Sequence, residues 1–144
     1  MFDSTAFATA VSPAGARKSG LMTPFLVVRV LTAAVFLFFG VLTLVSPAMI
    51  VEFERFGLPH WRVVTAVLEI AGGLGLVFGP KPHWLAAAAA GLGGLMIGAL
   101  VVRLRIDDPW YALLPAASLL LVNAWIAARA YAQAPRKPSG RAKL

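Results

Sequence analysis

Three polar residues interrupt apolar stretches that are otherwise nearly free of charge, and they are the candidates for chemistry in this chain. Arg29, Glu69 and Asn123 each lie well inside such a stretch. A charged side chain near the centre of a bilayer costs about 2.5–3.5 kcal/mol, so such residues normally face other protein groups and have a partner. A carboxyl group there can bind the head of a quinone or polar lipid, or exchange a proton. Paired with an arginine, it can instead fix the packing of the helices, and the sequence leaves both alternatives open.

The stretches around these residues are long enough to cross a membrane as helices. Of the 144 residues, 60% are hydrophobic and 13% are charged, whereas a soluble domain is about half apolar and a quarter charged. A spanning helix needs ~20 mostly apolar residues. The sequence therefore predicts an all-α integral membrane four-helix bundle over residues 21–130. The expected spanning helices are 24–45, 61–79, 83–102 and 110–130.

The segments outside these helices differ in composition. Residues 1–20 are small and polar, which predicts a disordered N-terminal tail. Residues 131–144 form a basic C-terminal tail. Between the first two spanning helices, residues 46–60 are amphipathic and predict a short interfacial helix. Its apolar face is expected to contain Met49, Ile50, Phe53 and Phe56.

The depths of the three polar residues predict that they meet. At a rise of about 1.5 Å per residue, Arg29 lies about 7–8 Å beyond Pro24. By the same rise, Glu69 lies about 15 Å and Asn123 about 10 Å from the ends of their helices on that side of the membrane. We therefore expect contact between Arg29 and Glu69, with Asn123 nearby, in one intramembrane polar site.

Small residues recur at helical spacing in the second and third spanning segments. Gly75 and Gly79 are separated by four positions, as are Gly94 and Gly98. Such spacing lets two helix backbones approach closely. The pattern predicts tight packing between these two helices, and the alternative is dimerisation through the same face.

The distribution of lysine and arginine predicts the orientation of the chain. The side with both termini and the second loop has eight basic residues near the helix ends, and the other side has four. The eight are Arg17, Lys18, Lys81, Arg129, Arg136, Lys137, Arg141 and Lys143, and the four are Arg55, Arg62, Arg103 and Arg105. Because cytoplasmic loops contain the excess of positive charge, both termini are expected to be cytoplasmic.

Composition also excludes several classes of site. The chain has no cysteine, so it forms no disulfide, thiolate nucleophile or cysteine-ligated iron–sulfur cluster. His60 and His83 are expected on opposite sides of the membrane, which argues against a metal site. The net charge of +7 comes mainly from chain ends beside apolar segments, so membrane lipid, not nucleic acid, is the expected partner. No covalently attached cofactor is expected.

The loop after the third spanning helix is charged. It contains Arg103, Arg105, Asp107 and Asp108. We expect a solvated turn, and the alternative is a surface that docks a partner or a lipid head group.

Several motifs together resemble the DoxX-like family of small four-helix bacterial membrane proteins. An early arginine, Arg29, is followed by the turn Phe56-Gly57-Leu58-Pro59, whose combination with a Glu-x-x-Gly-Gly motif is the most specific feature. The remaining matching segments are 68–74, 96–99 and 103–108. The resemblance covers about residues 24–130.

This resemblance implies a multi-pass protein of the bacterial cytoplasmic (inner) membrane with a role associated with oxidoreductases. It implies an accessory membrane subunit of a redox system that binds quinone or lipid, with a soluble redox or sulfurtransferase partner. The implied role applies most directly to Glu69 and Arg29. Two alternatives are a small proton-coupled transporter acting as a homo-oligomer and a non-catalytic membrane scaffold.

Overall fold

The computed structural model describes the backbone of residues 16–134 and the side chains of residues 24–134. This part of the chain is helical and contains no strand, and the predicted all-α class is confirmed. Four helices are long and apolar enough to cross a membrane, and the short amphipathic α2 lies between the first two. The helices are α1 (Ala16–Val45), α2 (Pro47–Arg55), α3 (Trp61–Phe78), α4 (Pro82–Arg105) and α5 (Trp110–Gln133).

The helix ends differ from the predicted ranges where polar residues continue a helix beyond its apolar stretch. Residues 16–20, predicted as part of the disordered tail, are helical, and Pro24 lies inside α1 instead of in its first turn. The C-terminal end of α4 includes Arg103 and Arg105. Backbone hydrogen bonds within a helix do not depend on the apolar side chains that mark a span, which explains these extensions. Residues 1–15 and 135–144, with most of the two predicted tails, lie outside the described residues.

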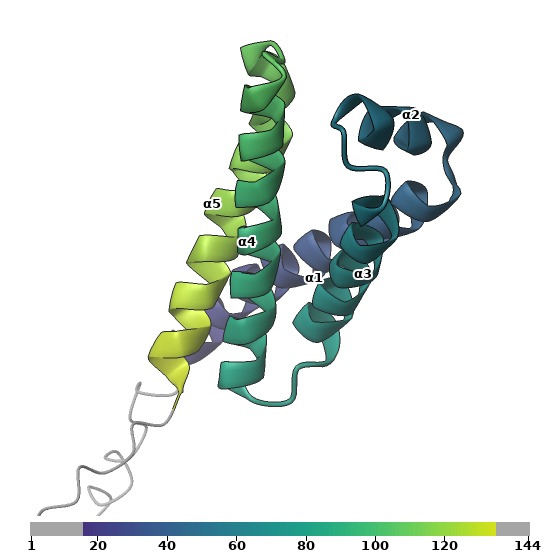
Figure 1. Ribbon diagram of the computed structural model, residues 1–144. Coiled ribbons are helices and arrows are strands. Elements are labelled where there is room, and N and C mark those ends of the chain that lie inside the picture. Colours follow the sequence, from purple (N-terminus) through teal and green to yellow (C-terminus); the bar gives the residue numbers. More distant parts are fainter. Residues whose placement is uncertain (1–15, 135–144) are drawn as a thin grey trace, which may run out of the picture.

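The spanning helices form two antiparallel pairs. α4 packs along α5, and α1 packs along α3, while fewer contacts join α3 to α4 and α1 to α5. Figure 1 shows the α1–α3 pair leaning away from the α4–α5 pair toward the side where α2 lies. We call this side the α2 end; it also contains the α4–α5 loop. The opposite side, which we call the terminal end, contains the α3–α4 turn and the C-terminal end of α5.

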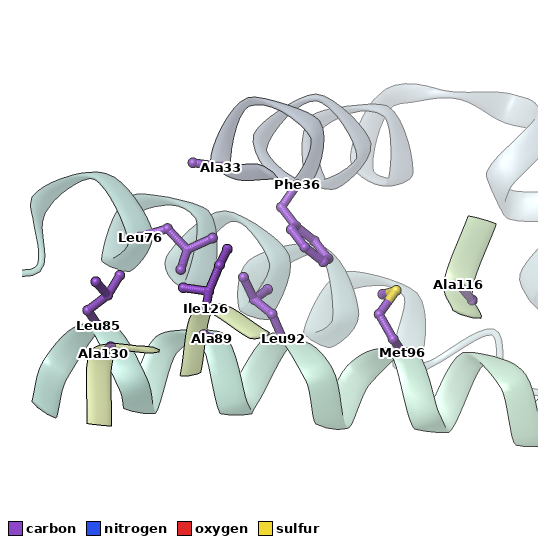
Figure 2. Close-up of a cluster of buried hydrophobic side chains, with 10 residues drawn as sticks. All are labelled: Ala33, Phe36, Leu76, Leu85, Ala89, Leu92, Met96, Ala116, Ile126 and Ala130. Carbon is purple, nitrogen blue, oxygen red and sulfur yellow. The ribbon is translucent and has the colours of Figure 1, made fainter. Parts of the chain in front are cut away.

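A narrow core joins the two pairs. Leu85, Ala89, Leu92 and Met96 are spaced three or four residues apart, so they project from one side of α4, as Figure 2 shows. They form a buried cluster with residues of the other three spanning helices, including Phe36 of α1. Many large apolar side chains instead face outward, as expected for helices in contact with lipid acyl chains.

Two glycines of the α1–α3 pair lie against the backbone of the partner helix. A Cβ added at Gly40 would lie 2.7 Å from the side chain of Ile70 and 3.1 Å from the backbone oxygen of Ala66. A Cβ at Gly73 would lie 3.2 Å from the backbone oxygen of Ala33. The absence of a side chain at these two positions therefore lets the α1 and α3 backbones approach each other.

The four glycines predicted to pack the second spanning helix against the third have different surroundings. A Cβ at Gly75 would lie 2.9 Å from the Cβ of Ala88 on α4, so Gly75 does lie at the α3–α4 contact. Gly79 ends α3, and a Cβ there would lie 2.6 Å from the oxygen of Gly75. A Cβ at Gly94 or Gly98 would meet nothing within 4 Å. These two do not pack against α3, because α4 diverges from α3 toward the α2 end.

α2 and α4 finish with the same local structure. At the end of α2, Leu58 N–H donates to Phe53 O, and Gly57 adopts a positive φ of 69°. At the end of α4, Asp108 N–H donates to Arg103 O, and the preceding residue, Asp107, has a φ of 54°. This arrangement is a Schellman motif, in which a left-handed residue reverses the chain after the helix. In α4 it turns Asp108 back toward the helix that it follows.

Candidate functional site

A large groove separates the two helix pairs. Its volume is about 1240 Å³. α3 and α4 form its two long walls, α2 covers its outer part, and Thr43 of α1 reaches its floor. The glycines of α4 along it are exposed, and no side chain covers the groove at these positions. The α4 glycines that line it are Gly91, Gly94 and Gly98.

Glu69 is the charged residue in the middle of this groove. It lies on the inward face of α3, its residue is 8% exposed, and it is eight positions after Trp61. At helical rise this places it about 12 Å from the start of the span, near the middle of the membrane. Thr43 lies beside its carboxyl group, whereas the Oε2 atom is buried without a hydrogen-bond partner among the described residues. A buried carboxylate oxygen without a partner is costly, which makes Glu69 the strongest candidate for ligand contact.

Arg29 does not reach Glu69. It donates hydrogen bonds to Leu76 O and, at 2.8 Å, to Val77 O. These carbonyls belong to the last turn of α3, where no further helical N–H is available. A third carbonyl of that turn, Gly75 O, accepts from the N–H of Gly79 at 3.0 Å. Arg29 therefore caps the C-terminal end of α3, where a positive charge also complements the helix dipole.

Arg62 does the same for α1. Its Nη1 donates to Thr43 O at 2.7 Å and to Leu44 O at 2.9 Å. The adjacent Leu42 O accepts from the N–H of Ser46 at 2.9 Å. Because α1 and α3 are antiparallel, an arginine near the start of each membrane span reaches the last turn of the other helix. In the sequence, Arg62 contributes only to the charge distribution that predicts the orientation, although its position one residue after the start of a span is a signal for a role at a helix end.

Asn123 lies apart from both residues. It is fully buried on α5, where it faces Gly93 of α4, and its Nδ2 donates to Leu119 O at 2.8 Å. Its Oδ1 is buried without a partner among the described residues. It does not line the groove. Arg29, Glu69 and Asn123 thus occupy three separate places, and the predicted contact between Arg29 and Glu69 is wrong. The prediction relied on the arginine side chain to bridge the difference in depth, whereas Arg29 binds carbonyl acceptors near its own level, at the end of α3.

A cluster of ion pairs closes the groove at the α2 end. Arg55 of α2 contacts Asp108 of the α4–α5 loop at 2.6 Å, and Arg103 of α4 contacts the same carboxylate at 2.7 Å. Arg55 also contacts Glu52 at 2.8 Å, and the ring of Phe56 lies near both arginine side chains. We call the Arg55–Asp108–Arg103 contact the Asp108 bridge. It joins the two helix pairs at the end where their axes diverge.

The surroundings of Asp108 differ from the solvated turn expected from the sequence. Its side chain is only 6% exposed. Hydrogen bonds from Arg55 lower the pKa of Asp108, partial burial opposes this shift, and Arg103 adds to it. A carboxylate with a lowered pKa stabilises the fold at higher pH and loses this contribution as pH falls through the folded-state pKa. The bridge is therefore present at neutral pH and is lost only in strongly acidic solution.

Comparison with known proteins identifies the family. No curated protein and no solved structure matches this chain. The profile of the DoxX-like family matches residues 27–126, a region that includes the groove, Glu69 and the Asp108 bridge. This match covers more than half of the 144 residues. The chain is therefore a multi-pass membrane protein that belongs to the DoxX-like family.

Proposed function

We propose that the groove binds a long-chain amphipathic ligand, a quinone or a polar-headed lipid, and that the chain is an accessory membrane subunit of a redox system. The observation that supports this most directly is the buried, unpartnered Oε2 of Glu69 inside an apolar groove. A carboxyl group accepts a hydrogen bond from a ligand hydroxyl or, when it holds a proton, donates one to a ligand carbonyl. Thr43 supplies a second polar group beside it.

The dimensions of the groove fit such a ligand. Its lining extends from Trp61 at the start of α3 to Phe78 at the end, which is about 25 Å at helical rise. A polar head at Glu69 would leave apolar wall on both sides for a chain. The open side at the α4 glycines would admit the ligand directly from the lipid acyl layer. This apolar lining favours a hydrophobic ligand over the hydrated path that a proton-coupled transporter needs.

The proposed role in a redox system is based on membership of the DoxX-like family. A membrane subunit of this kind would exchange electrons or sulfur groups with a soluble redox or sulfurtransferase partner. We also propose that copies of the chain associate with each other as a homo-oligomer. The location proposed is the bacterial inner membrane.

The proposed orientation places the terminal end on the cytoplasmic side. Eight basic residues against four predict it. Alkaline phosphatase fused after Leu144 should be inactive, and a fluorescent protein at the same place should be bright. A fusion in the α4–α5 loop after Asp107 should give the opposite pair of results. Active phosphatase at Leu144 would reverse the assignment.

The proposed ligand site is tested by measuring isoprenoid quinone that remains with the purified protein. Wild-type protein in nanodiscs containing a defined amount of quinone should retain it after washing. Glu69→Leu should lose about five- to tenfold in apparent affinity, because one hydrogen bond to a buried polar group contributes on the order of 1–1.5 kcal/mol. Thr43→Val should give a smaller loss.

Glu54→Leu is the matched control for this measurement. Glu54 is an exposed carboxylate on α2 that does not line the groove. This variant removes a carboxylate of the same size and charge as that of Glu69, and it should bind quinone like the wild type. Equal retention by Glu69→Leu, or retention no higher than in protein-free nanodiscs, would refute the quinone site.

A further inference from the structure

A second, smaller cavity at the terminal end collects positive charge from three elements of the fold. Its volume is about 450 Å³. Arg29 of α1, Lys81 of the α3–α4 turn and Arg129 of α5 all line it. We call it the basic pocket. It shares only Gly79 and Pro80 of the α3–α4 turn with the groove and contains neither Glu69 nor the Asp108 bridge.

None of the described acidic residues lies at this pocket. Glu52, Glu54, Asp107 and Asp108 are on α2 and the α4–α5 loop, at the opposite end of the molecule, and Glu69 is midway along α3. Part of the charge of Arg29 is compensated by the carbonyls of the α3 terminus. Lys81 and Arg129 have no carboxylate partner among residues 24–134. Like charges held together without a counterion repel each other, so an anion bound between them would stabilise this end.

Arg129 lies beside two aromatic side chains, and its Nε lacks a hydrogen-bond acceptor. Its guanidinium lies 6.0 Å from the ring centroid of Phe25 and 5.8 Å from that of Trp125. These two aromatic side chains hold the arginine in place against the pocket. Its Nε is nevertheless buried without a hydrogen-bond partner among the described residues. A buried donor without an acceptor is costly, so an acceptor brought beside this guanidinium would stabilise it.

The position and lining of the pocket indicate a lipid as the source of the anion. Lys81 lies in the turn between two spans, and Arg129 is four residues before the end of α5, about 6 Å at helical rise. This is the level of phospholipid head groups. Phe25 and Leu26 also line the pocket, and Leu26 is 54% exposed on the surface that faces acyl chains. A free phosphate would leave this apolar wall without a contact.

We propose that Arg29, Lys81 and Arg129 bind the phosphate of an anionic phospholipid, whose acyl chain lies along α1. Basic pockets between spanning helices bind anionic lipid head groups in this way, through charge-assisted hydrogen bonds to phosphate oxygens. The proposal does not depend on the ligand of the groove, because the two sites use different side chains.

The test is thermal unfolding of the purified full-length protein in a neutral detergent with short-chain phosphatidylglycerol, short-chain phosphatidylcholine or inorganic phosphate. Phosphatidylglycerol should raise the unfolding temperature in a saturable manner, and the other two should not. The Lys81→Gln/Arg129→Gln variant should bind phosphatidylglycerol on the order of 30-fold more weakly, because the binding free energies of two basic contacts are lost together. Equal stabilisation by phosphatidylcholine, or by inorganic phosphate, would overturn the proposal.

Two further variants keep this test decisive. Arg105→Gln removes an exposed positive charge at the α2 end and should leave the phosphatidylglycerol effect unchanged. If the loss of Arg129 unfolds the protein, Lys81→Gln alone changes an exposed turn residue and should weaken binding about fivefold. Unchanged binding in Lys81→Gln and in any folded Arg129 variant would show that the pocket is not the lipid site.

Discussion

Arg62→Met should lower the free energy of unfolding by about 2–6 kcal/mol, because it leaves two acceptors at the end of α1 without a donor. The acceptors are Thr43 O and Leu44 O, at 2.7 and 2.9 Å from Nη1. An unsatisfied carbonyl is costly where water cannot replace the lost bond, and the bond to Thr43 O is partly buried. Arg29→Met should have a comparable effect at the end of α3, where it uncovers Leu76 O and Val77 O.

Denaturant unfolding of the detergent-purified variants measures these losses. Arg105→Met is the matched control, because Arg105 is exposed and makes none of the hydrogen bonds described here; it should change stability by less than about 0.5 kcal/mol. Stability in Arg62→Met equal to that of this control would mean that the α1 terminus obtains other donors in the membrane.

The same variants separate helix capping from an ion pair. The last-turn carbonyls that hold Arg29 are seven and eight residues after Glu69 on α3, about 10–12 Å along the helix. The effects of Arg29→Met and Glu69→Gln should therefore add to within about 0.5 kcal/mol in a double-mutant cycle. Strong coupling would restore the contact that the sequence predicted.

Leucine at Gly75 and leucine at Gly94 should have opposite consequences, although both glycines belong to the same small-residue pattern. At Gly75 the new Cβ would lie 2.9 Å from the Cβ of Ala88, where the two helix pairs meet. Overpacking of this kind typically costs about 1–3 kcal/mol, so Gly75→Leu should lower the unfolding free energy by that amount. At Gly94 the new side chain enters open space in the groove.

Gly94→Leu should therefore keep the wild-type stability and lose the groove ligand. A leucine side chain occupies volume that the proposed quinone or lipid chain needs, so apparent affinity should fall at least about tenfold, an energy of about 1.4 kcal/mol. Thermal unfolding and quinone retention, measured on the same preparations of both variants, give the comparison. Gly98→Leu should resemble Gly94→Leu, because its Cβ also meets nothing within 4 Å. If Gly94→Leu destabilises the protein as much as Gly75→Leu, the groove is closed in the membrane and the ligand proposal fails.

The Asp108 bridge lies at one end of the groove that the leucine variants change. It joins α2 to the α4–α5 loop across the end of the groove, while the other junction of the two pairs is the core around Leu92 and Ala89. The groove is thus bounded by a charged contact at one end and by packed apolar side chains toward the other. A ligand that entered along the open side would leave both junctions intact.

The sequence by itself determined the number of spanning helices, the amphipathic α2 and the family. These properties depend on local composition: a run of apolar residues must be helical in lipid because each backbone group needs a partner within the segment. Proline and glycine between the runs then fix where the helices stop, as at Gly79 and Pro80. The motifs around Gly57 and Glu69 identified the family for the same reason, because they are contiguous in the chain.

Only the tertiary structure decided which polar residues meet. Arg29 and Glu69 lie on neighbouring helices, but Arg29 binds carbonyls at the end of α3, seven and eight residues after Glu69, and a depth estimate does not include these competing acceptors. The same holds for Gly75 and Gly94, where the divergence of two helix pairs makes one glycine a contact and the other the wall of a groove. Arg62 and Asp108 gained their roles because antiparallel packing and a left-handed turn brought distant segments of the chain within hydrogen-bonding distance.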